Sequence, residues 1–337
     1  MSRISQSPCK IIIIVTPHFN MSATMGFVDP FRVANYLGGT SRFRWQIVSE
    51  RGGPCPASNG TELGTIPLSQ VQGQSADIVI VSSSWAPETH NSTPLHAALW
   101  RWAGQGATLG ALDTGAFILA QAGLLKEKRA TVHYEHIDAF GEMYPDIEMS
   151  EDLFIFDGNR ISCAGGSASV DFALNILRGA LGDGQANAAA RYLFHPSVRP
   201  AGSQQNAGPM EPLGNTAPRI VKRAITLMEK NLETPIPIAD VCNLIGISHR
   251  QLNRLFRTYV KKTPALYYRD IRLDRARGLV TQTDMAMAQV AVASGFASQV
   301  HFSRAYRDRF GLPPRRDRVE GRVPFEFRAW PLHRKAK

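Results

Sequence analysis

The chain has 337 residues with 38 Lys/Arg and 28 Asp/Glu, a formal net charge of +10 and a length typical of two domains. Residues 1–218 carry 14 basic and 18 acidic side chains, whereas residues 219–337 carry 24 and 10. This split indicates a mildly acidic sensor joined to a module that binds a polyanion. The apolar run Ile11–Val15 is too short for a signal-peptide core or a bilayer span, so we expect no membrane partner.

The cysteines carry no metal-binding or disulfide pattern. Cys9, Cys55, Cys163 and Cys242 are scattered, with no CxxC pair and no ligand spacing to histidine. We interpret them as reduced thiols of a cytoplasmic protein. The sequence therefore predicts neither a metal site nor a cofactor.

The first part of the chain alternates between strand and helix patterns. Strands are expected at residues 10–15, 43–49, 76–83 and 107–112, with helices at 20–37, 94–103, 115–125 and 187–194. The β-branched run 10–15 is typical of a central strand covered on both faces, and Pro30 is expected near a helix start or at a kink. The pattern predicts an α/β fold over residues 8–195, with a doubly wound, mostly parallel, flavodoxin-like sheet. Ligands of such sheets bind at the carboxyl ends of the strands.

Asp113 stands at the junction between a strand and a helix. It lies within Leu109–Phe117 between small residues, which is the pattern of a nucleophile elbow. Asp113 either caps the helix or also faces a pocket, where its carboxylate would favour a cationic ligand. Trp85 adds a cation–π face or packs on the surface, and His133 is a pocket or a structural histidine. The remaining candidate ligand-binding residues are Thr114 and Gly166.

This first domain resembles the PfpI/glutamine-amidotransferase-like domain of GlxA-type regulators. The resemblance rests on Gly115–Leu125, Arg129–His136 and Cys163–Asp171. Enzyme members of that family carry a cysteine at the elbow, where the helix N-terminus lowers the pKa of the thiol. Because Asp113 stands there, the resemblance implies an enzyme fold kept as a ligand pocket, without catalytic residues. The alternative is a PfpI-like hydrolase or amidase with an appended DNA-binding domain, since aspartate is a nucleophile in other enzymes.

Two segments of the chain carry no periodic apolar pattern. Residues 196–217 are rich in Pro, Gly, Asn and Ser, which indicates a linker. Helical spacing resumes at 219–231 and opens a second, all-α domain expected over residues 218–318. The basic segment 319–337 is expected to be a solvated tail.

Residues 236–314 contain the same helix-turn-helix pattern twice. Ala239, Val241 and Gly246 recur 49 residues later, and a set of five residues recurs 50 residues later. The five pairs are Ser248 and Ser298, Leu252 and Phe302, Arg254 and Arg304, Phe256 and Tyr306, and Arg257 and Arg307. In each copy a glycine ends the first helix, a serine caps the second, and the apolar residues of the second helix form a buried stripe.

The opposite face of each second helix carries side chains that read base edges or bind phosphates. We expect base readout from Arg250, Asn253, Arg254, Gln299, His301 and Arg304. Arg257 and Arg307 are expected to contact phosphates.

This second part resembles the DNA-binding domain of AraC/XylS-type activators. The resemblance rests on Gly295–Phe296, Phe302–Arg307 and Phe310–Pro314, with a long helix over residues 264–280 between the two units. The whole chain is most similar to regulators of carnitine, glycine betaine and arginine catabolism, whose ligands all carry a positive charge. The resemblance implies an activator that responds to a small cationic metabolite and acts with RNA polymerase at promoter DNA. Our working hypothesis is that the α/β domain forms a homodimer. The mixed polar and basic faces argue against a nonspecific nucleoid-type protein.

Overall fold

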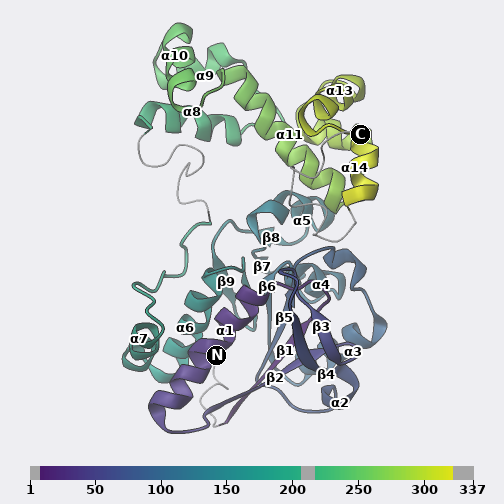
Figure 1. The fold of residues 1–337 in the computed structure, drawn as a ribbon, viewed down its shortest axis with the longest axis vertical. Helices are drawn as coiled ribbons and strands as arrows, with labels where there is room; N and C mark the ends of the chain where they lie inside the picture. Colours follow the sequence, from purple (N-terminus) through teal and green to yellow (C-terminus); the bar gives the residue numbers. More distant parts are fainter. Residues whose placement is uncertain (1–7, 206–216, 322–337) are drawn as a thin grey trace. The chain divides into compact units, whose positions relative to one another are not determined.

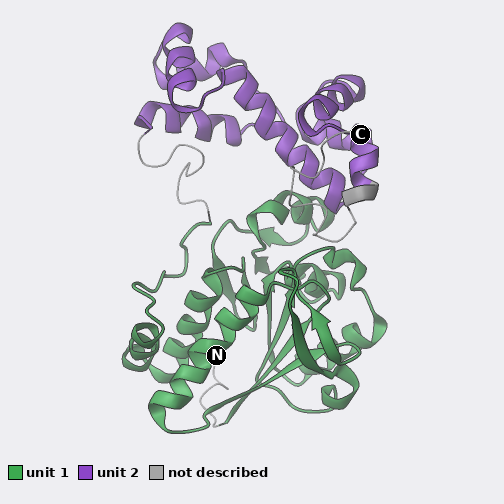
Figure 2. Ribbon diagram, in the orientation of Figure 1, with its two compact units in different colours: residues 1–205 green, residues 206–337 purple. Residues whose placement is uncertain are grey.

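The computed structural model describes residues 8–205 and 217–321 (Figure 1). The chain divides into two compact units, residues 1–205 and residues 206–337 (Figure 2). Within the expected linker, residues 206–216 lie outside the described residues, and so do residues 322–337 of the expected tail.

The first unit is built on an eight-stranded sheet in the order β3-β4-β2-β1-β5-β6-β10-β9. Neighbours from β4 to β10 pair in parallel, whereas β3 and β9 pair antiparallel at the two edges. The strands are β1 (Cys9–Val15), β2 (Phe43–Ser49), β3 (Gly53–Pro56), β4 (Glu62–Pro67), β5 (Ile78–Ser83), β6 (Thr108–Asp113), β9 (Phe154–Asp157) and β10 (Arg160–Cys163). A separate parallel pair is formed by β7 (Arg129–Ala130) and β8 (Glu148–Met149). The mostly parallel sheet is therefore confirmed.

Helices cover both faces of this sheet. Ile11, Ile13 and Val15 of β1 belong to one core, with apolar residues of α1, α6 and α7. Ile12 and Ile14 belong to a second core, with residues of α2, α3, α4 and α5. The helices are α1 (Met21–Gly38), α2 (Leu68–Val71), α3 (Thr93–Gly104), α4 (Gly115–Gln121), α5 (Ile137–Met143), α6 (Ala168–Leu181) and α7 (Asp183–Tyr192). Because alternate side chains of a strand point to opposite faces, this division confirms the doubly wound arrangement.

Two details of the first unit differ from the expectations. Pro30 lies buried in the interior of α1, so of its two expected places only the helix start is wrong, while Asn20 caps that helix by accepting from the backbone of Ala23. Residues 196–205, expected in the linker, are held against the first unit. The backbone N–H of Leu153 donates to Ser203 at 2.7 Å, and residue 205 donates its N–H to the carbonyl oxygen of residue 151 at 2.8 Å.

The second unit is all helical in its described part, as expected. Its helix-turn-helix pairs are α9 with α10 and α12 with α13, and the long helix α11 connects them along the chain. The helices are α8 (Arg219–Glu229), α9 (Ile238–Ile245), α10 (His249–Tyr259), α11 (Pro264–Gln282), α12 (Met287–Ala293), α13 (Gln299–Phe310) and α14 (Pro314–Gly321). In the described ranges of both units, no helix is long and apolar enough to cross a bilayer.

Candidate functional site

Asp113 ends β6 at the carboxyl edge of the sheet, where it pairs in register with Ser83 of β5. Its φ of 60° lies in the left-handed region, which few residues other than glycine adopt. Gly115 opens α4 directly afterwards, and a Cβ at that position would collide with the carbonyl oxygen of Val81. The backbone therefore makes a tight strand-to-helix turn with Asp113 at its apex.

The side chain of Asp113 is held by residues distant in sequence. Only 4% of Asp113 is exposed, and the Asn20 amide donates to its Oδ2 at 2.8 Å. On another side, a Cβ at Gly165 would lie 3.0 Å from the Cβ of Asp113, so the loop after β10 closes tightly over the carboxylate. The residue that caps α4 is Thr114, without a side-chain cap bond. The interpretation of Asp113 as a helix cap is therefore wrong, since its carboxylate is engaged elsewhere.

The carboxyl group of Asp113 is electrostatically costly to ionise. Burial raises its pKa from 3.8 to about 6, against the lowering effects of nearby His133 and of the hydrogen bond from Asn20. Within the described part of the chain, no Lys or Arg forms an ion pair with it. A buried carboxylate in this state gains from any cation placed beside it, because an opposite charge favours the ionised form.

The other predicted ligand residues lie along the same edge, with different roles. The backbone N–H of His133 donates to the Asp113 carbonyl oxygen at 3.3 Å, and its side chain is 31% exposed. Trp85 is half-buried two residues beyond the end of β5. Thr114 is fully buried and its hydroxyl donates to the Ser84 carbonyl oxygen at 2.8 Å, while its predicted ligand contact stays a prediction. Gly166 has a left-handed φ of 55° in the loop that covers Asp113.

Sequence reasoning missed Asn20, which donates to the Asp113 carboxylate, and Gly165, which packs against the Asp113 side chain. Both follow the ends of strands, β1 and β10, that flank β5 and β6 in the sheet. An amide five residues after the end of a central strand, and a pair of glycines shortly after another strand, were available signals for this edge.

Cys163 bears on the alternative enzyme interpretation, because a reactive thiol near the elbow would be a candidate nucleophile. It is fully buried at the end of β10, and burial raises the pKa of its thiol to about 12. The backbone N–H of Gly165 donates to its sulfur at 3.5 Å. A thiol with this pKa is protonated at neutral pH and is a poor nucleophile. The described residues contain no cluster of three or more His, Cys, Asp or Glu side chains that could hold a metal ion.

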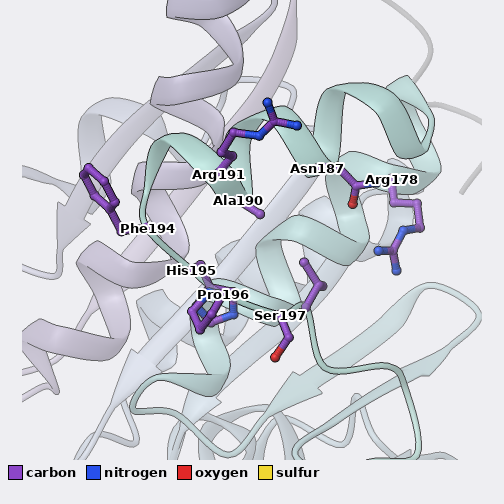
Figure 3. Close-up of a pocket in the computed structure, with 9 residues that line it drawn as sticks. Arg178, Asn187, Ala190, Arg191, Phe194, His195, Pro196 and Ser197 are labelled. Atoms are coloured by element: carbon purple, nitrogen blue, oxygen red, sulfur yellow. The ribbon is translucent and has the colours of Figure 1, made fainter.

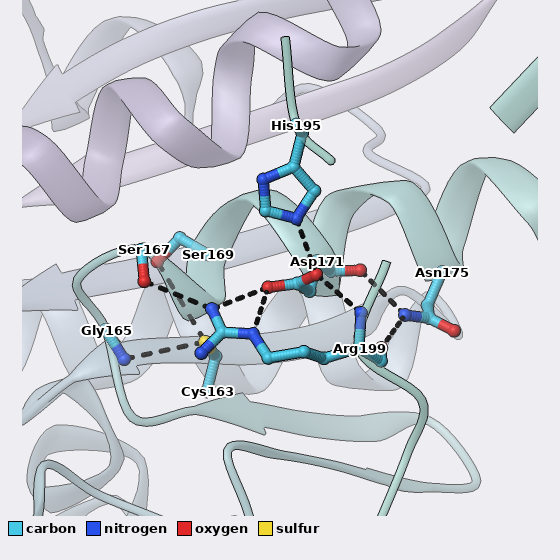
Figure 4. A network of polar contacts seen from close by, with 8 residues as sticks. All are labelled: Cys163, Gly165, Ser167, Ser169, Asp171, Asn175, His195 and Arg199. Carbon is cyan, nitrogen blue, oxygen red and sulfur yellow. Dashed lines mark hydrogen bonds and ion pairs between the residues drawn. The ribbon is translucent and has the colours of Figure 1, made fainter. Parts of the chain in front are cut away.

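The loop after β10 also holds the segment that follows α7 (Figure 4). Asp171 of α6 is fully buried and accepts from the backbone N–H of Arg199 and from its guanidinium Nε, both at 2.8 Å. The ring of His195 hydrogen-bonds to the same carboxylate at 2.7 Å. Arg199 donates in addition to the hydroxyl of Ser167, two residues from Gly165, at 3.1 Å. One loop, residues 164–167, thus contacts the elbow and fixes the chain that leaves the first unit.

A cavity of about 580 Å³ lies beside this segment (Figure 3). Its walls include Arg178 and Arg191, whose guanidinium groups point in different directions and do not converge on one point. Arg178 is already paired with Asp183 at 2.7 Å. Phe194 stands at the rim, 94% exposed. These two arginines therefore do not act together as one binding group in the cavity.

In the second unit, α10 and α13 have the same pattern of burial. Residues 249–259 and 299–309 agree position by position in being exposed, half-buried or buried. The expected stripes are confirmed, since Leu252, Phe256, Phe302 and Tyr306 are fully buried. The caps are also confirmed, because the hydroxyls of residues 248 and 298 each accept from a backbone N–H at 3.2 Å. The glycines of both turns, 246 and 295, have left-handed φ values of 77° and 72°.

The predicted DNA contacts lie on the open side of these helices. Asn253 is half-buried, and its amide lies 3.1 Å from the ring of His249. The exposed residues are Arg250, Arg254, Arg257, Gln299, His301, Arg304 and Arg307. Among the described residues none of these arginines pairs with a carboxylate. Three acids of the unit, Asp270, Asp274 and Asp317, are instead paired with Lys262, Arg277 and Arg309. The positive charge of the open faces is therefore available for phosphates.

Comparisons with known proteins agree with both halves of the chain. Residues 9–179 match the DJ-1/PfpI family, and residues 241–319 match a helix-turn-helix domain. The HTH-type transcriptional regulator CdhR of Pseudomonas aeruginosa is 36% identical over 310 residues, covering 91% of this chain and 90% of that protein. The HTH-type transcriptional regulator GbdR of the same species is 34% identical, covering 93% and 85%.

A solved structure also matches more than half of the chain. The crystal structure of an AraC family transcriptional regulator from Pseudomonas putida matches with a TM-score of 0.50 and 25% identity, covering 55% of this chain and all of that chain. The two family matches occupy consecutive parts of one chain, and the relatives match across both. The chain therefore belongs to the transcriptional regulators in which a DJ-1/PfpI sensing domain precedes an AraC-type DNA-binding domain.

Proposed function

We propose that this protein is a transcriptional activator that responds to a small cationic metabolite bound at the carboxyl edge of the sheet, beside Asp113. Carnitine, glycine betaine and a basic amino acid have the required positive charge. The α10 and α13 helices read successive major-groove faces of one promoter site. The regulator acts in the cytoplasm as a homodimer and recruits RNA polymerase.

The buried carboxylate of Asp113 is the observation that carries the ligand class. Its pKa of about 6 means that the ionised form is disfavoured by the protein around it. A quaternary ammonium or guanidinium group beside the carboxylate would remove much of this penalty, and the face of Trp85 suits such a group. A ligand of this class therefore binds more tightly as Asp113 loses its proton.

The 164–167 loop supplies a route from the ligand to the rest of the chain. It packs on Asp113 through Gly165 and holds Arg199 through Ser167. Regulation requires that ligand bind two states of the protein with different affinity. We place that difference in this loop, because a shift on its Asp113 side alters the anchor of the segment leading to the DNA-binding unit.

A thermal-shift screen of the full-length protein tests the ligand class. Choline, carnitine, glycine betaine and arginine are compared with neutral and anionic metabolites. At 100 times its Kd a ligand adds about 2.7 kcal/mol, which raises the Tm of a unit of this size by roughly 5–10 °C. Comparing the Tm shifts caused by choline and by glycine betaine also shows whether a carboxylate on the ligand is needed for binding.

The matched variants are Asp113→Asn and Glu135→Gln. Glu135 is an exposed acid two residues from His133, so its loss changes the local potential but leaves the buried carboxylate in place. We expect the Tm increase caused by a cationic ligand to disappear in Asp113→Asn and to persist in Glu135→Gln. A shift confined to neutral or anionic compounds, or one unchanged in Asp113→Asn, would refute the proposal.

A further inference from the structure

Val300 is an apolar side chain in the middle of a cationic surface. It is the second residue of α13, is 68% exposed, and lines a hollow with Ser303, Arg304 and Arg307. These positions are three, four and seven residues further along the helix, so all four form one stripe. A lone exposed valine is ordinary on a protein surface, but this one stands where the helix is otherwise polar.

The internal repeat gives this position a counterpart. Val300 corresponds to Arg250 of α10, and both are exposed on helices with the same pattern of burial. Further along the stripe, Arg254 and Arg257 correspond to Arg304 and Arg307 and keep their charge. At this one place in the stripe, the repeat exchanges a cation for a hydrocarbon. The two helices therefore differ in what they can recognise there.

The charge around Val300 indicates its partner. Arg304 and Arg307 are exposed and form no ion pair with the part of the chain that the structure describes. The partner of this surface must therefore bring anions, which a DNA duplex supplies on both sides of its groove. Residues at the N-terminus of a recognition helix contact base edges, and the apolar group on those edges in the major groove is the 5-methyl of thymine.

We propose that Val300 reads a T·A base pair by packing on the thymine methyl, whereas Arg250 reads a guanine at the corresponding place in the other half of the site. This assignment rests on the proposed placement of α13 in the major groove. It makes the two halves of the operator different in sequence even though the two helices share their framework.

Replacing thymine by uracil, which lacks the methyl, tests the contact directly. The full-length protein first selects its sites from a random duplex library. Each thymine in the preferred half-site is then replaced by uracil, and Kd is measured for the wild type, Val300→Ala and Val292→Ala. Val292 of α12 is a matched control, because it is also exposed, at 63%, but lies off the stripe.

We expect one thymine-to-uracil change to weaken the wild type about fourfold, the value for one buried methyl group. Val300→Ala should bind the thymine and uracil duplexes equally, while Val292→Ala should behave as the wild type. The proposal is wrong if Val300→Ala and the uracil substitution each raise Kd and the two factors multiply when both changes are combined. It is also wrong if no uracil substitution raises the Kd of the wild type.

Two further variants separate the outcomes. Val300→Arg copies the residue of the first repeat and should change the selected base pair from T·A to G·C at the uracil-sensitive position. An unchanged selection would contradict our assignment. Arg304→Ala reports on the placement of the helix itself. If Arg304→Ala weakens DNA binding while Val300→Ala does not, the methyl contact is wrong and the placement of α13 in the groove stands. If neither variant changes DNA binding, the methyl contact and the placement of α13 are both wrong.

Discussion

Replacing Asp113 by asparagine removes the ionisable group and keeps the shape of the elbow. Asparagine tolerates the φ of 60°, and its amide oxygen accepts the hydrogen bond that Asn20 donates. In the wild type the folded protein raises the pKa from 3.8 to about 6, a shift of about two pH units. At 1.36 kcal/mol per unit, ionisation of Asp113 costs the folded state on the order of 3 kcal/mol.

The sign of the pH dependence follows from proton binding. Between about pH 4 and pH 6 the folded state keeps a proton at Asp113 that the unfolded chain has lost. The wild-type free energy of unfolding therefore falls as pH rises through this window, and the difference is complete above pH 6. The Asp113→Asn variant lacks this pH dependence. We therefore expect its free energy of unfolding, relative to that of the wild type, to rise by about 3 kcal/mol between pH 4 and pH 7.

Urea titrations at four pH values from 4.5 to 7.5 measure this difference. Tryptophan fluorescence reports mainly on the first unit, which contains four of the five tryptophans, Trp45, Trp85, Trp100 and Trp102. Glu62→Gln, at an exposed position, serves as the control. Its free energy of unfolding should differ from that of the wild type by the same small amount at every pH. A difference between Asp113→Asn and wild type that stays constant across the range would show that Asp113 titrates like a surface carboxylate. A cationic ligand beside Asp113 would then lose its physical basis.

The remaining predictions concern two arginines of α10, the loop after β10 and the thiol of Cys163. Arg254→Ala should cost about 1–3 kcal/mol of DNA binding and relax the preference at one or two base pairs, seen in competition assays. Arg257→Ala should weaken all sequences alike and reduce the slope of log K against log salt by about 1; a loss confined to one base pair would instead make Arg257 a base contact. Gly165→Ala should lower the free energy of unfolding by about 1–3 kcal/mol in urea titrations, because its φ is 91° and its Cβ would lie 3.0 Å from Asp113. Cys163 should react with a thiol reagent at neutral pH far more slowly than a free cysteine, and fast labelling in the native protein would reopen the hydrolase interpretation.

The helical half of the chain was largely predictable from sequence. Leu252 and Phe256 recur as Phe302 and Tyr306, and the structure buries all four completely. The caps and the left-handed glycines of both turns were also correctly predicted. These features depend on contacts within a few residues, and helical periodicity exposes such contacts directly in the sequence. The roles of individual arginines in base readout remain predictions.

At the elbow, the position of Asp113 was predictable from sequence but the partners of the neighbouring side chains were not. The alternation of strands and helices, together with small residues around Asp113, placed this residue at the carboxyl edge of a parallel sheet. The sequence did not show that its carboxylate accepts from Asn20, 93 positions earlier, or that Thr114 turns its hydroxyl to a backbone oxygen. Those partners depend on the order of the strands, with β1, β5, β6 and β10 side by side.

The sequence by itself therefore determined the two kinds of domain, the repeat and its exposed faces. Only the tertiary structure decided that Gly165 closes over Asp113 and that Arg199 is tied to buried Asp171, which turns part of an expected linker into an anchored segment. The physical reason is that a Pro- and Gly-rich segment has no periodic pattern of its own. Its conformation follows from hydrogen bonds to groups that the folded sheet and helices place beside it.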